Sequence, residues 1–276
     1  MKNLLDRFTS GALSAIGGIG RAVMDLGAHT FKVYNLLVET IRWVVIGPFK
    51  KKFVKSDAIF SQMVFTGVES LIIAFFVAMF TGVVIAMQTA PQLATFGGTV
   101  YVASLVAVSI ARELGPVLTA LVVAGRVGSA MTAELGTMKV SEQIEALETI
   151  ALNPVRFLVV PRFLALCVML PCLTIIADFA GIIGGFIVGV FSLHISPALY
   201  IDVTFRFLTA KDVTTGLVKA FVFAVTIAMI ACYKGLNTKG GAEGVGKSTT
   251  QSVVISFILI ILFDCILTGI FYFTKV

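Results

Sequence analysis

Five charged side chains interrupt stretches of sequence that are otherwise apolar: Arg112, Glu113, Asp178, Lys219 and Asp264. An ionised group inside hydrocarbon is costly unless it is paired or faces a polar cavity, so each is a candidate for binding or transport. Five such groups are few for a path that carries a hydrophilic solute. They suit a mostly apolar cavity with polar anchors, which an amphiphile would occupy. For Asp178 and Asp264, structural ion pairs between helices are the alternative.

Arg112 and Glu113 are neighbours in the sequence. On a helix their side chains point about 100° apart, so they do not simply pair with each other. We expect both to engage groups on other helices or a charged ligand.

Residues 241–248, GAEGVGKS, match the phosphate-loop pattern GxxxxGK[ST] letter for letter. That loop binds nucleotide only between a buried strand and a helix. Here apolar stretches of membrane length flank the segment, and no βαβ unit is indicated. The sequence therefore favours a flexible cytoplasmic connector, in which Lys247 meets lipid headgroups or a partner.

The cysteines and histidines of the sequence do not indicate a metal-binding or catalytic site. The four cysteines lie in apolar runs without a CxxC pair, and His29 and His194 are far apart. Buried free thiols that act as small hydrophobic side chains are the simpler interpretation. We expect no metal site and no catalytic residue.

The amino-acid composition indicates that the apolar stretches around these residues lie in a membrane. Of 276 residues, 58% are hydrophobic and 13% are charged, and the mean hydropathy is +1.02. A soluble domain averages about 25% charged residues, which excludes an ordinary cytosolic enzyme, a disordered chain and a secreted disulfide scaffold. The expected fold is an all-α integral membrane protein with five transmembrane helices, at about 68–88, 101–128, 157–191, 213–233 and 252–273.

The stretch from Ser70 to Ala111 holds no charged residue and is too long for one span of about 20 residues. Pro91 and the glycine pair at 97–98 predict a turn between Gln88 and Gly98. Small residues recur at every fourth position elsewhere, which lets helix backbones approach closely within one subunit or at a dimer seam. These small faces are Ala177, Gly181, Gly185 and Gly189, and Ala120, Ala124, Gly128 and Thr132.

An amphipathic helix is predicted before the first span, within an N-terminal region 1–56 that precedes a membrane domain at 57–276. Apolar residues recur at helical spacing from Phe31 to Val45, while Lys32, Glu39 and Arg42 lie on the other face. We expect this helix in the membrane interface, with its tryptophan at headgroup level. A solvated helix packed on a partner is the alternative.

Lysine and arginine crowd one side of this topology, and the run Lys50, Lys51, Lys52 and Lys55 is the densest group. The positive-inside rule then places the N-terminus in the cytoplasm. After five spans the C-terminus lies on the opposite side.

The segment KVSEQIEALETIALNP, from Lys139 to Pro154, predicts a short cytoplasmic helix at 140–152, capped by Ser141. A helix with an apolar and an acidic face suits a groove on a cytosolic partner. Lying flat on the membrane is the alternative. The apolar face is Val140, Ile144, Leu147 and Ala151, and the acidic face is Glu142, Glu145 and Glu148.

Residues 112–165, which begin RELGPVLTALVVAGRVGSAMTAELGTMKVSEQIEAL, resemble the hallmark region of the MlaE (YrbE) family of ABC-transporter permeases. Residues 234–254, KGLNTKGGAEGVGKSTTQSVV, resemble the second hallmark of that family, which also accounts for the phosphate-loop match. The resemblance covers nearly the whole chain from about residue 30. It implies a multi-pass permease of the bacterial inner membrane, with its C-terminus in the periplasm. Such a permease moves phospholipids to or from a periplasmic MCE-protein route and maintains outer-membrane lipid asymmetry.

The same resemblance implies partners. Permeases of this family are homodimers that work with a cytosolic ABC ATPase, an MCE-domain ring and often a small STAS-domain protein. ATP would be bound by the ATPase, so this chain is expected to be no enzyme, to hold no cofactor and to bind no nucleic acid.

Site residues also follow from the resemblance. Arg112 would attract a phosphate, and Glu113 would tune that attraction or pair with Lys219. The lipid cavity would be formed by Arg112, Glu113, Leu114, Gly115, Pro116 and Lys219. The segment from Glu134 to Ile150 would couple to the ATPase, through Glu134, Val140, Glu142, Ile144, Glu145, Leu147 and Glu148. Glu243 and Lys247 would lie in a cytoplasmic loop near headgroups.

Three alternatives stay open. The cargo could be a sterol or another lipid. An ion-coupled secondary transporter would use Asp178, Asp264 and Lys219 as an ion path, and the helix at 140–152 would be dispensable. A non-transporting scaffold would explain the small-residue faces, but not charges in mid-span. The sequence fixes neither the direction of transport nor the presence of a STAS partner.

Overall fold

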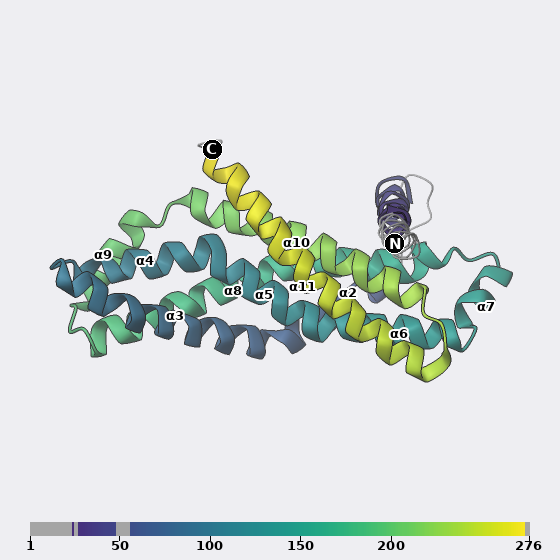
Figure 1. Ribbon diagram of the computed structural model, residues 1–276, viewed down its shortest axis with the longest axis horizontal. Coiled ribbons are helices and arrows are strands. Elements are labelled where there is room, and N and C mark those ends of the chain that lie inside the picture. Colours follow the sequence, from purple (N-terminus) through teal and green to yellow (C-terminus); the bar gives the residue numbers. More distant parts are fainter. Residues whose placement is uncertain (1–23, 25–26, 48–55, 274–276) are drawn as a thin grey trace, which may run out of the picture.

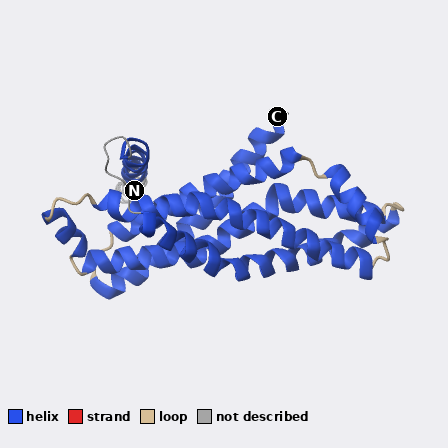
Figure 2. Ribbon diagram, turned by 180° about the vertical axis from the view of Figure 1, so that it is seen from behind, coloured by secondary structure: helices blue, strands red, loops and turns tan. Residues whose placement is uncertain are grey.

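The computed structural model describes residues 24, 27–47 and 56–273, and every regular element in this part of the chain is a helix (Figures 1 and 2). Within these residues, five helical rods are long and apolar enough to cross a membrane, which confirms the predicted all-α membrane fold. All five extend beyond the predicted apolar windows. The rods are Ser56–Thr95, Thr99–Val140, Val155–Phe191, Ala210–Leu236 and Gly241–Phe273.

Several rods are composed of shorter segments. The first comprises α2 (Ser56–Met63), the π-helical η1 (Val64–Val68) and α3 (Glu69–Thr95). The second comprises η2 (Thr99–Tyr101), α4 (Val102–Ser109), the π-helical η3 (Ile110–Leu114), α5 (Gly115–Val123), the π-helical η4 (Ala124–Gly128) and α6 (Ser129–Val140). The third comprises the π-helical η5 (Val155–Val159) and α8 (Val160–Phe191). The others are α10 (Ala210–Leu236) and α11 (Gly241–Phe273), and the connecting helices are α7 (Gln143–Thr149) and α9 (Pro197–Phe207).

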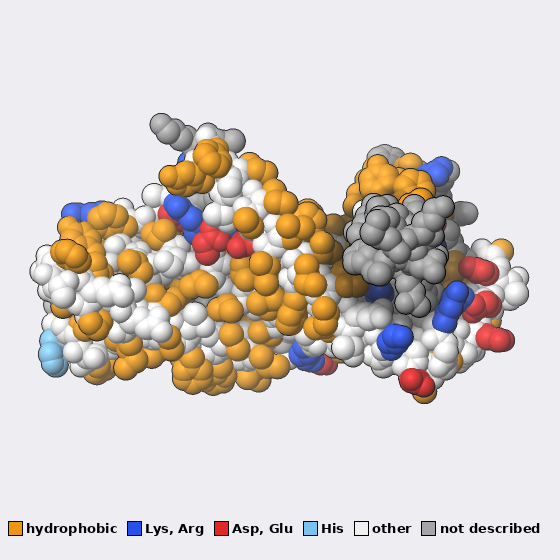
Figure 3. Space-filling model, viewed as in Figure 1, with side chains coloured by type: hydrophobic (Ala, Val, Ile, Leu, Met, Phe, Trp, Pro, Cys, Tyr) orange, Lys and Arg blue, Asp and Glu red, His pale blue; other side chains and the backbone are white. Residues whose placement is uncertain are grey.

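The rods form one elongated bundle (Figure 1). α3 packs along α8, and α10 packs against both α8 and α6, while α11 crosses α10 and α6 with most of its surface exposed. A central core of apolar side chains joins α5, α6, α8 and α10, with Met131, Leu166 and Phe223 fully buried in it. Hydrophobic side chains also cover much of the outer surface (Figure 3), as expected where a helix bundle meets lipid tails.

Small residues bring helix backbones into contact within the chain. A Cβ added to Gly82 would lie 1.9 Å from the carbonyl oxygen of Gly181, and one added to Gly184 would lie 2.1 Å from that of Met79. Of the small face of α8, Gly181 therefore packs on α3, whereas a Cβ on Gly185 or Gly189 would meet Tyr200 of α9. The second small face packs on α10, where a Cβ on Gly128 would contact an isoleucine side chain at 3.2 Å.

Residues 27–47 form a helix that crosses the bundle, and Figure 1 views it nearly end-on. One face packs on the central core and the exposed face is also largely apolar. The residues on the core are Val33, Leu36, Leu37 and Val44, and the exposed apolar ones are Phe31, Tyr34, Val38, Ile41 and Val45. The predicted basic run at 50–55 lies outside the described residues.

The turn between the first two spans is shorter than predicted. α3 continues through Pro91 to Thr95, so only residues 96–98 form the turn instead of 88–98. A proline removes one backbone hydrogen bond, and membrane helices tolerate that loss.

The helix between the second and third rods is also shorter than predicted. It spans Gln143–Thr149 instead of 140–152, and Ser141 does not cap it. The Ser141 hydroxyl donates instead to the Thr137 carbonyl at the end of α6, 2.8 Å away. Glu142 follows with φ +60°, a left-handed conformation that turns the chain sharply into α7.

The segment that matches the phosphate-loop pattern is helical, so the expectation of a flexible connector is wrong. Gly240 and Gly241 have φ values of +92° and +68°, and α11 begins at Gly241. Because glycine adopts positive φ without steric cost, the connection closes within residues 237–240. Residues 241–248 are the first turns of α11, and no strand precedes them in the described chain.

We expect Gly82→Ala to lower the melting temperature of the detergent-solubilised protein, because the new methyl group must push the α8 backbone away. Overpacking of this kind costs about 1–3 kcal/mol. Gly246→Ala is the matched control, since its Cβ would meet nothing within 4 Å. Equal melting temperatures for the two variants would contradict the close approach of α3 and α8.

Candidate functional site

A π-helical segment positions the adjacent charges Arg112 and Glu113. Pro116 has no N–H, and its ring would clash with the carbonyl four residues earlier, that of Arg112. The rod widens over η3, where the N–H of Gly115 donates to the carbonyl of Ile110. Segments of this kind occur frequently at functional sites. From η3, Arg112 reaches α10, and Glu113 reaches both α10 and α11.

Asp212, at the start of α10, holds Arg112. The Arg112 Nε lies 2.9 Å from Asp212 Oδ1, and a second guanidinium nitrogen contacts the same oxygen. Asp212 Oδ2 accepts from the backbone N–H and the hydroxyl of Thr209, at 3.0 and 2.8 Å, in a capping box. The side chain of Asp212 is 3% exposed and that of Arg112 is 51% exposed. The guanidinium is therefore fixed in orientation but keeps free surface.

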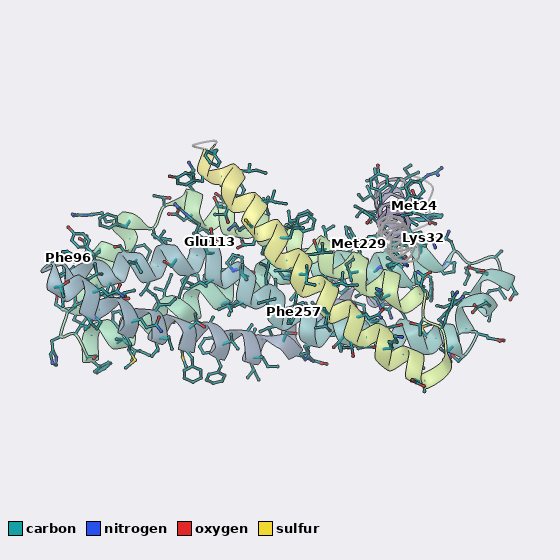
Figure 4. All side chains as sticks on the ribbon, viewed as in Figure 1. Met24, Lys32, Phe96, Glu113, Met229 and Phe257 are labelled. Carbon is teal, nitrogen blue, oxygen red and sulfur yellow. The ribbon has the colours of Figure 1, made fainter. Side chains whose placement is uncertain are left out.

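Lys219 lies at the centre of a second ion-pair cluster. Its side chain is fully buried, and its Nζ contacts the Glu113 carboxylate, lies 2.9 Å from Asp264 Oδ1 and donates to the Thr268 hydroxyl at 2.7 Å. Thr268 Oγ1 lies 3.1 Å from Glu113 Oε1. The cluster thus ties η3, α10 and α11 together, and Figure 4 shows Glu113 beside α11. A buried cation needs partners of this kind.

A polar cavity of about 300 Å³ opens beside these two clusters. It combines cationic groups, which suit a phosphate, with aromatic rings, which suit hydrocarbon. We call it the Arg112 cavity. Its lining residues are Arg112, Glu113, Lys211, Thr215, Thr268, Phe271 and Tyr272.

Only two of the six residues predicted for a lipid cavity, Arg112 and Glu113, line the Arg112 cavity. The other four do not: Gly115, Pro116 and Lys219 are buried, and Leu114 is half-buried outside the cavity wall. Gly115 shows the packing: a Cβ on it would lie 1.8 Å from Asp178 Oδ1. The residues that do not line the cavity are Leu114, Gly115, Pro116 and Lys219.

Asp212 and Lys211 contribute to this site without having been expected there. The spacing of Thr209 and Asp212 is a capping-box signature, so the sequence signals a helix start. The same carboxylate also takes Arg112, which is 100 residues away in the chain. No local sequence pattern predicts the contact between Arg112 and Asp212.

Part of the apolar face predicted around α7 is occupied within the chain. Ile144 is buried in the central core, and Leu147 packs against it. Val140 and Ala151, the other two residues of that face, are exposed, so only this part of the face is open to a partner. Glu142 and Glu148 are exposed, so α7 presents an acidic surface.

Two ion pairs brace the end of the bundle that carries α7. Glu134 lies 2.7 Å from the guanidinium of Arg162, whose side chain is 6% exposed, and so connects α6 to α8. Lys139 pairs with Glu145, and this hydrogen bond holds the pKa of the Glu145 carboxyl below its ordinary value. Glu145 is therefore ionised at neutral pH.

The remaining predicted residues lie at the same end. Val140, at the end of α6, is exposed, and so are Glu243 and Lys247 on the first turns of α11. Figure 1 shows α6 and α7 at this end of the bundle. Among the described residues, no three side chains of His, Cys, Asp or Glu gather closely enough to hold a metal ion.

Comparison with known proteins decides the family. The family model for permease MlaE matches residues 59–270. The chain belongs to the MlaE permease family. The matched segment contains both ion-pair clusters of this MlaE-family permease.

Individual relatives agree with this assignment. The intermembrane phospholipid transport system permease protein MlaE of Haemophilus influenzae is 35% identical over 262 residues, which are 93% of this chain and 97% of the relative. A probable ABC transporter permease protein of Rickettsia prowazekii is 38% identical over 249 residues, 90% of this chain and 96% of the relative. The chloroplastic protein trigalactosyldiacylglycerol 1 of Arabidopsis thaliana is 36% identical over 211 residues, 76% of this chain and 60% of the relative.

We expect Lys219→Met to destabilise this MlaE-family permease, because it leaves the Glu113 and Asp264 carboxylates unpaired. Breaking a fully buried ion pair costs about 3–5 kcal/mol. The loss should be towards the lower end, since these side chains are 32% and 24% exposed. Thermal unfolding in detergent measures the effect.

Two further variants control this experiment. Arg206→Met should change little, because its ion pair with Asp202 is exposed and 3.6 Å long. Neutralising both carboxylates in the Lys219→Met background, with Glu113→Gln and Asp264→Asn, should restore most of the stability. No recovery in that triple variant would contradict the pairing.

Proposed function

We propose that this chain is the permease subunit of an ABC-type lipid transporter of the bacterial inner membrane. It moves phospholipids between that membrane and a periplasmic MCE-protein route, and so maintains outer-membrane lipid asymmetry. The observation that carries the proposal is the half-exposed guanidinium of Arg112, fixed by Asp212 at a cavity that also holds Phe271 and Tyr272. The name of the Haemophilus relative, an intermembrane phospholipid transport permease, supports the cargo class.

The charges of the Arg112 cavity suit a phospholipid headgroup. Guanidinium N–H groups bind phosphate oxygens in pairs, and Lys211 adds a second positive charge to the cavity wall. Glu113 is held by Lys219, so its repulsion of a phosphate is reduced. The acyl chains then lie against Phe271, Tyr272 and the apolar surface of α11.

The exposed face of α11 supports a homodimer. In this helix of 33 residues only Ser252, Ser256 and Ile260 are buried. A second copy on this face would enclose the Arg112 cavity, to which α11 contributes, and make it a space shared between two subunits. The exposed apolar residues of the face are Val254, Ile258, Ile261, Leu262, Ile266 and Ile270.

A separate cytosolic ATPase supplies the energy, and α7 with the end of α6 is its docking surface. The acidic residues Glu142 and Glu148 are exposed there. The Lys139–Glu145 and Glu134–Arg162 pairs anchor the surface to α6 and α8, so a push on α7 reaches the spans. An MCE-domain protein receives or delivers the lipid at the opposite end.

This proposal includes an orientation in the membrane. The end that carries α7 and the helix at residues 27–47 faces the cytoplasm, together with the N-terminus. The helix at 27–47 lies in the membrane interface, since its exposed face is apolar. The C-terminus lies in the periplasm, and residues 57–276 form the permease domain.

Replacing Arg112 should strongly reduce lipid transfer. We expect Arg112→Ala to reduce ATP-driven phospholipid transfer by at least about tenfold in proteoliposomes that contain the ATPase. A hydrogen bond to a charged group contributes about 1.5–3 kcal/mol, and this variant removes the groups that would hold the phosphate.

Controls separate this effect from misfolding. Arg112→Ala leaves the buried Asp212 unpaired, so the double variant with Asp212→Asn is the fold control and should show the same loss with normal assembly. Arg206→Ala, which is exposed on α9, should transport at the wild-type rate. Full transport by the assembled double variant would overturn the role of Arg112.

Charge reversal on α7 should release the ATPase. We expect Glu148→Arg to reduce the ATPase recovered with the tagged permease in mild detergent by about fivefold, since about 1 kcal/mol corresponds to that factor. Asp202→Arg makes the same charge change on α9, at the other end of the bundle (Figure 1), and should have no effect. Equal recovery from both variants would contradict docking at α7.

A further inference from the structure

A groove of about 430 Å³ lies between the helix at residues 27–47, α10 and α11, and we call it the Lys234 groove. It extends along α10 from Val225 to Lys234, which is about 14 Å of helix at about 1.5 Å per residue. No described residue lines both this groove and the Arg112 cavity, so the two sites are separate. Its apolar walls include Val33, Leu37, Met229 (Figure 4), Ile255, Leu259 and Phe263.

Polar side chains lie at one end of the Lys234 groove. Lys234 is in the last turn of α10, and its Nζ donates to Gln251 Oε1 on α11, 3.1 Å away. His29 lines the same end from the helix at 27–47, and its Nδ1 lies 2.6 Å from the Tyr233 hydroxyl oxygen. The groove is therefore polar where α10 ends.

The rest of the groove is apolar. Among the described residues, Thr226 is the one polar side chain that lines this deeper part. Its hydroxyl already donates to the Val222 carbonyl, 2.9 Å away. The deeper part therefore offers contacts for hydrocarbon, and the groove as a whole has the polarity of an amphiphile.

Lys234 carries a positive charge that forms no ion pair with a carboxylate of the described chain. Its side chain is half-buried, its partner Gln251 is neutral, and no described aspartate or glutamate lines the groove. An ammonium group has three N–H donors, so two of them remain for a ligand. Basic pockets between membrane helices bind anionic lipid headgroups. The charge of Lys234 therefore favours an anion at the polar end of the groove.

We propose that the Lys234 groove binds an anionic phospholipid. One acyl chain lies along the apolar walls, and the phosphate lies at the polar end, where Lys234 Nζ donates to it. His29 supplies a second donor. When its Nδ1 accepts from the Tyr233 hydroxyl, its Nε2 carries a proton and donates to the phosphate.

A zwitterionic lipid fits this groove less well. Phosphatidylcholine has the same phosphate, but its quaternary ammonium group would find no carboxylate among the lining residues and would lie near the Lys234 cation. Like charges placed together in this way disfavour binding. The bound anionic lipid contacts all three helices, so it holds the helix at 27–47 against α10 and α11. This site is additional to the Arg112 cavity and does not depend on transport.

Photolabelling of the full chain in phosphatidylcholine nanodiscs tests this proposal. The probe is phosphatidylglycerol with a diazirine in one acyl chain, and phosphatidylcholine with the same diazirine is the matched comparison. We expect phosphatidylglycerol to label peptides from residues 27–47 and 225–234 at least about fivefold more strongly, since about 1 kcal/mol corresponds to that factor. Unlabelled phosphatidylglycerol should compete with this labelling.

Variants of Lys234 then locate the headgroup. Lys234→Met should remove the preference for phosphatidylglycerol, so that both probes label these peptides equally. Lys234→Arg keeps the positive charge and should keep the preference. Lys239→Met is the control, because it removes the same charge from an exposed residue just before α11 that does not line the groove. It should label like the wild type.

Three results would overturn the proposal. The first is no competable labelling of these peptides, which would indicate a protein segment as the occupant. The others are equal labelling of the wild type by the two probes and an undiminished preference in Lys234→Met. Lipid in the Arg112 cavity would label residues 268–272 instead, so the two sites are distinguished. Because the assay contains no ATPase, failure of the proposed transport function would leave its result unchanged.

Discussion

Lys219 has no exposed side-chain surface, and two carboxylates and a hydroxyl surround its ammonium group. A lysine in this position would be expensive in hydrocarbon if any of the three helices around it moved away. The pairing therefore fixes η3, α10 and α11 at one height in the bundle. It also takes up the charge of Glu113, which leaves the positive charges of Arg112 and Lys211 accessible in the Arg112 cavity. The Arg112 cavity exists in its present form because Lys219 is satisfied beneath it.

The π-helical segments also help to position these charged residues. Two π-helical segments, η3 and η5, end two residues before a proline, Pro116 and Pro161 respectively. In each, the rod takes in an extra residue instead of breaking where a proline ring would strike the preceding turn. At η3 this extra residue changes the direction of the side chains that follow. The charged pair at 112–113 can then reach two different helices, which a regular helix with the same sequence would not arrange in the same way.

Much of this architecture follows from the sequence, because span number and length depend on local hydropathy. The pairing of Glu113 with Lys219 was predictable for the same reason, since a lone charge in a span needs a partner. The contact of Asp212 with Arg112 was not predictable. The capping-box spacing explains Asp212 as a local helix start and gives no reason to expect a distant partner. Periodicity predicts the apolar face around α7, but it does not show that Ile144 is buried within the chain while Val140 is exposed. The glycines at 240–241 end the turn before α11, and Gly241 also begins the match to the phosphate-loop pattern. Only the backbone conformation shows that they form a turn and not a nucleotide-binding loop.

The second rod has a mechanical consequence. It runs without a break from Thr99 to Val140 and has 42 residues, which at about 1.5 Å per residue is about 60 Å of helix. The hydrocarbon layer is about 30 Å thick, and tilt in membrane helices rarely exceeds about 40°. At any such tilt the rod is longer than the layer it crosses, so part of it stands in water. Arg112 lies on the part of the second rod that crosses the membrane, and α7 follows the end of the rod that stands in water. The rod therefore connects the charged wall of the Arg112 cavity directly to the part of the chain that stands outside the membrane.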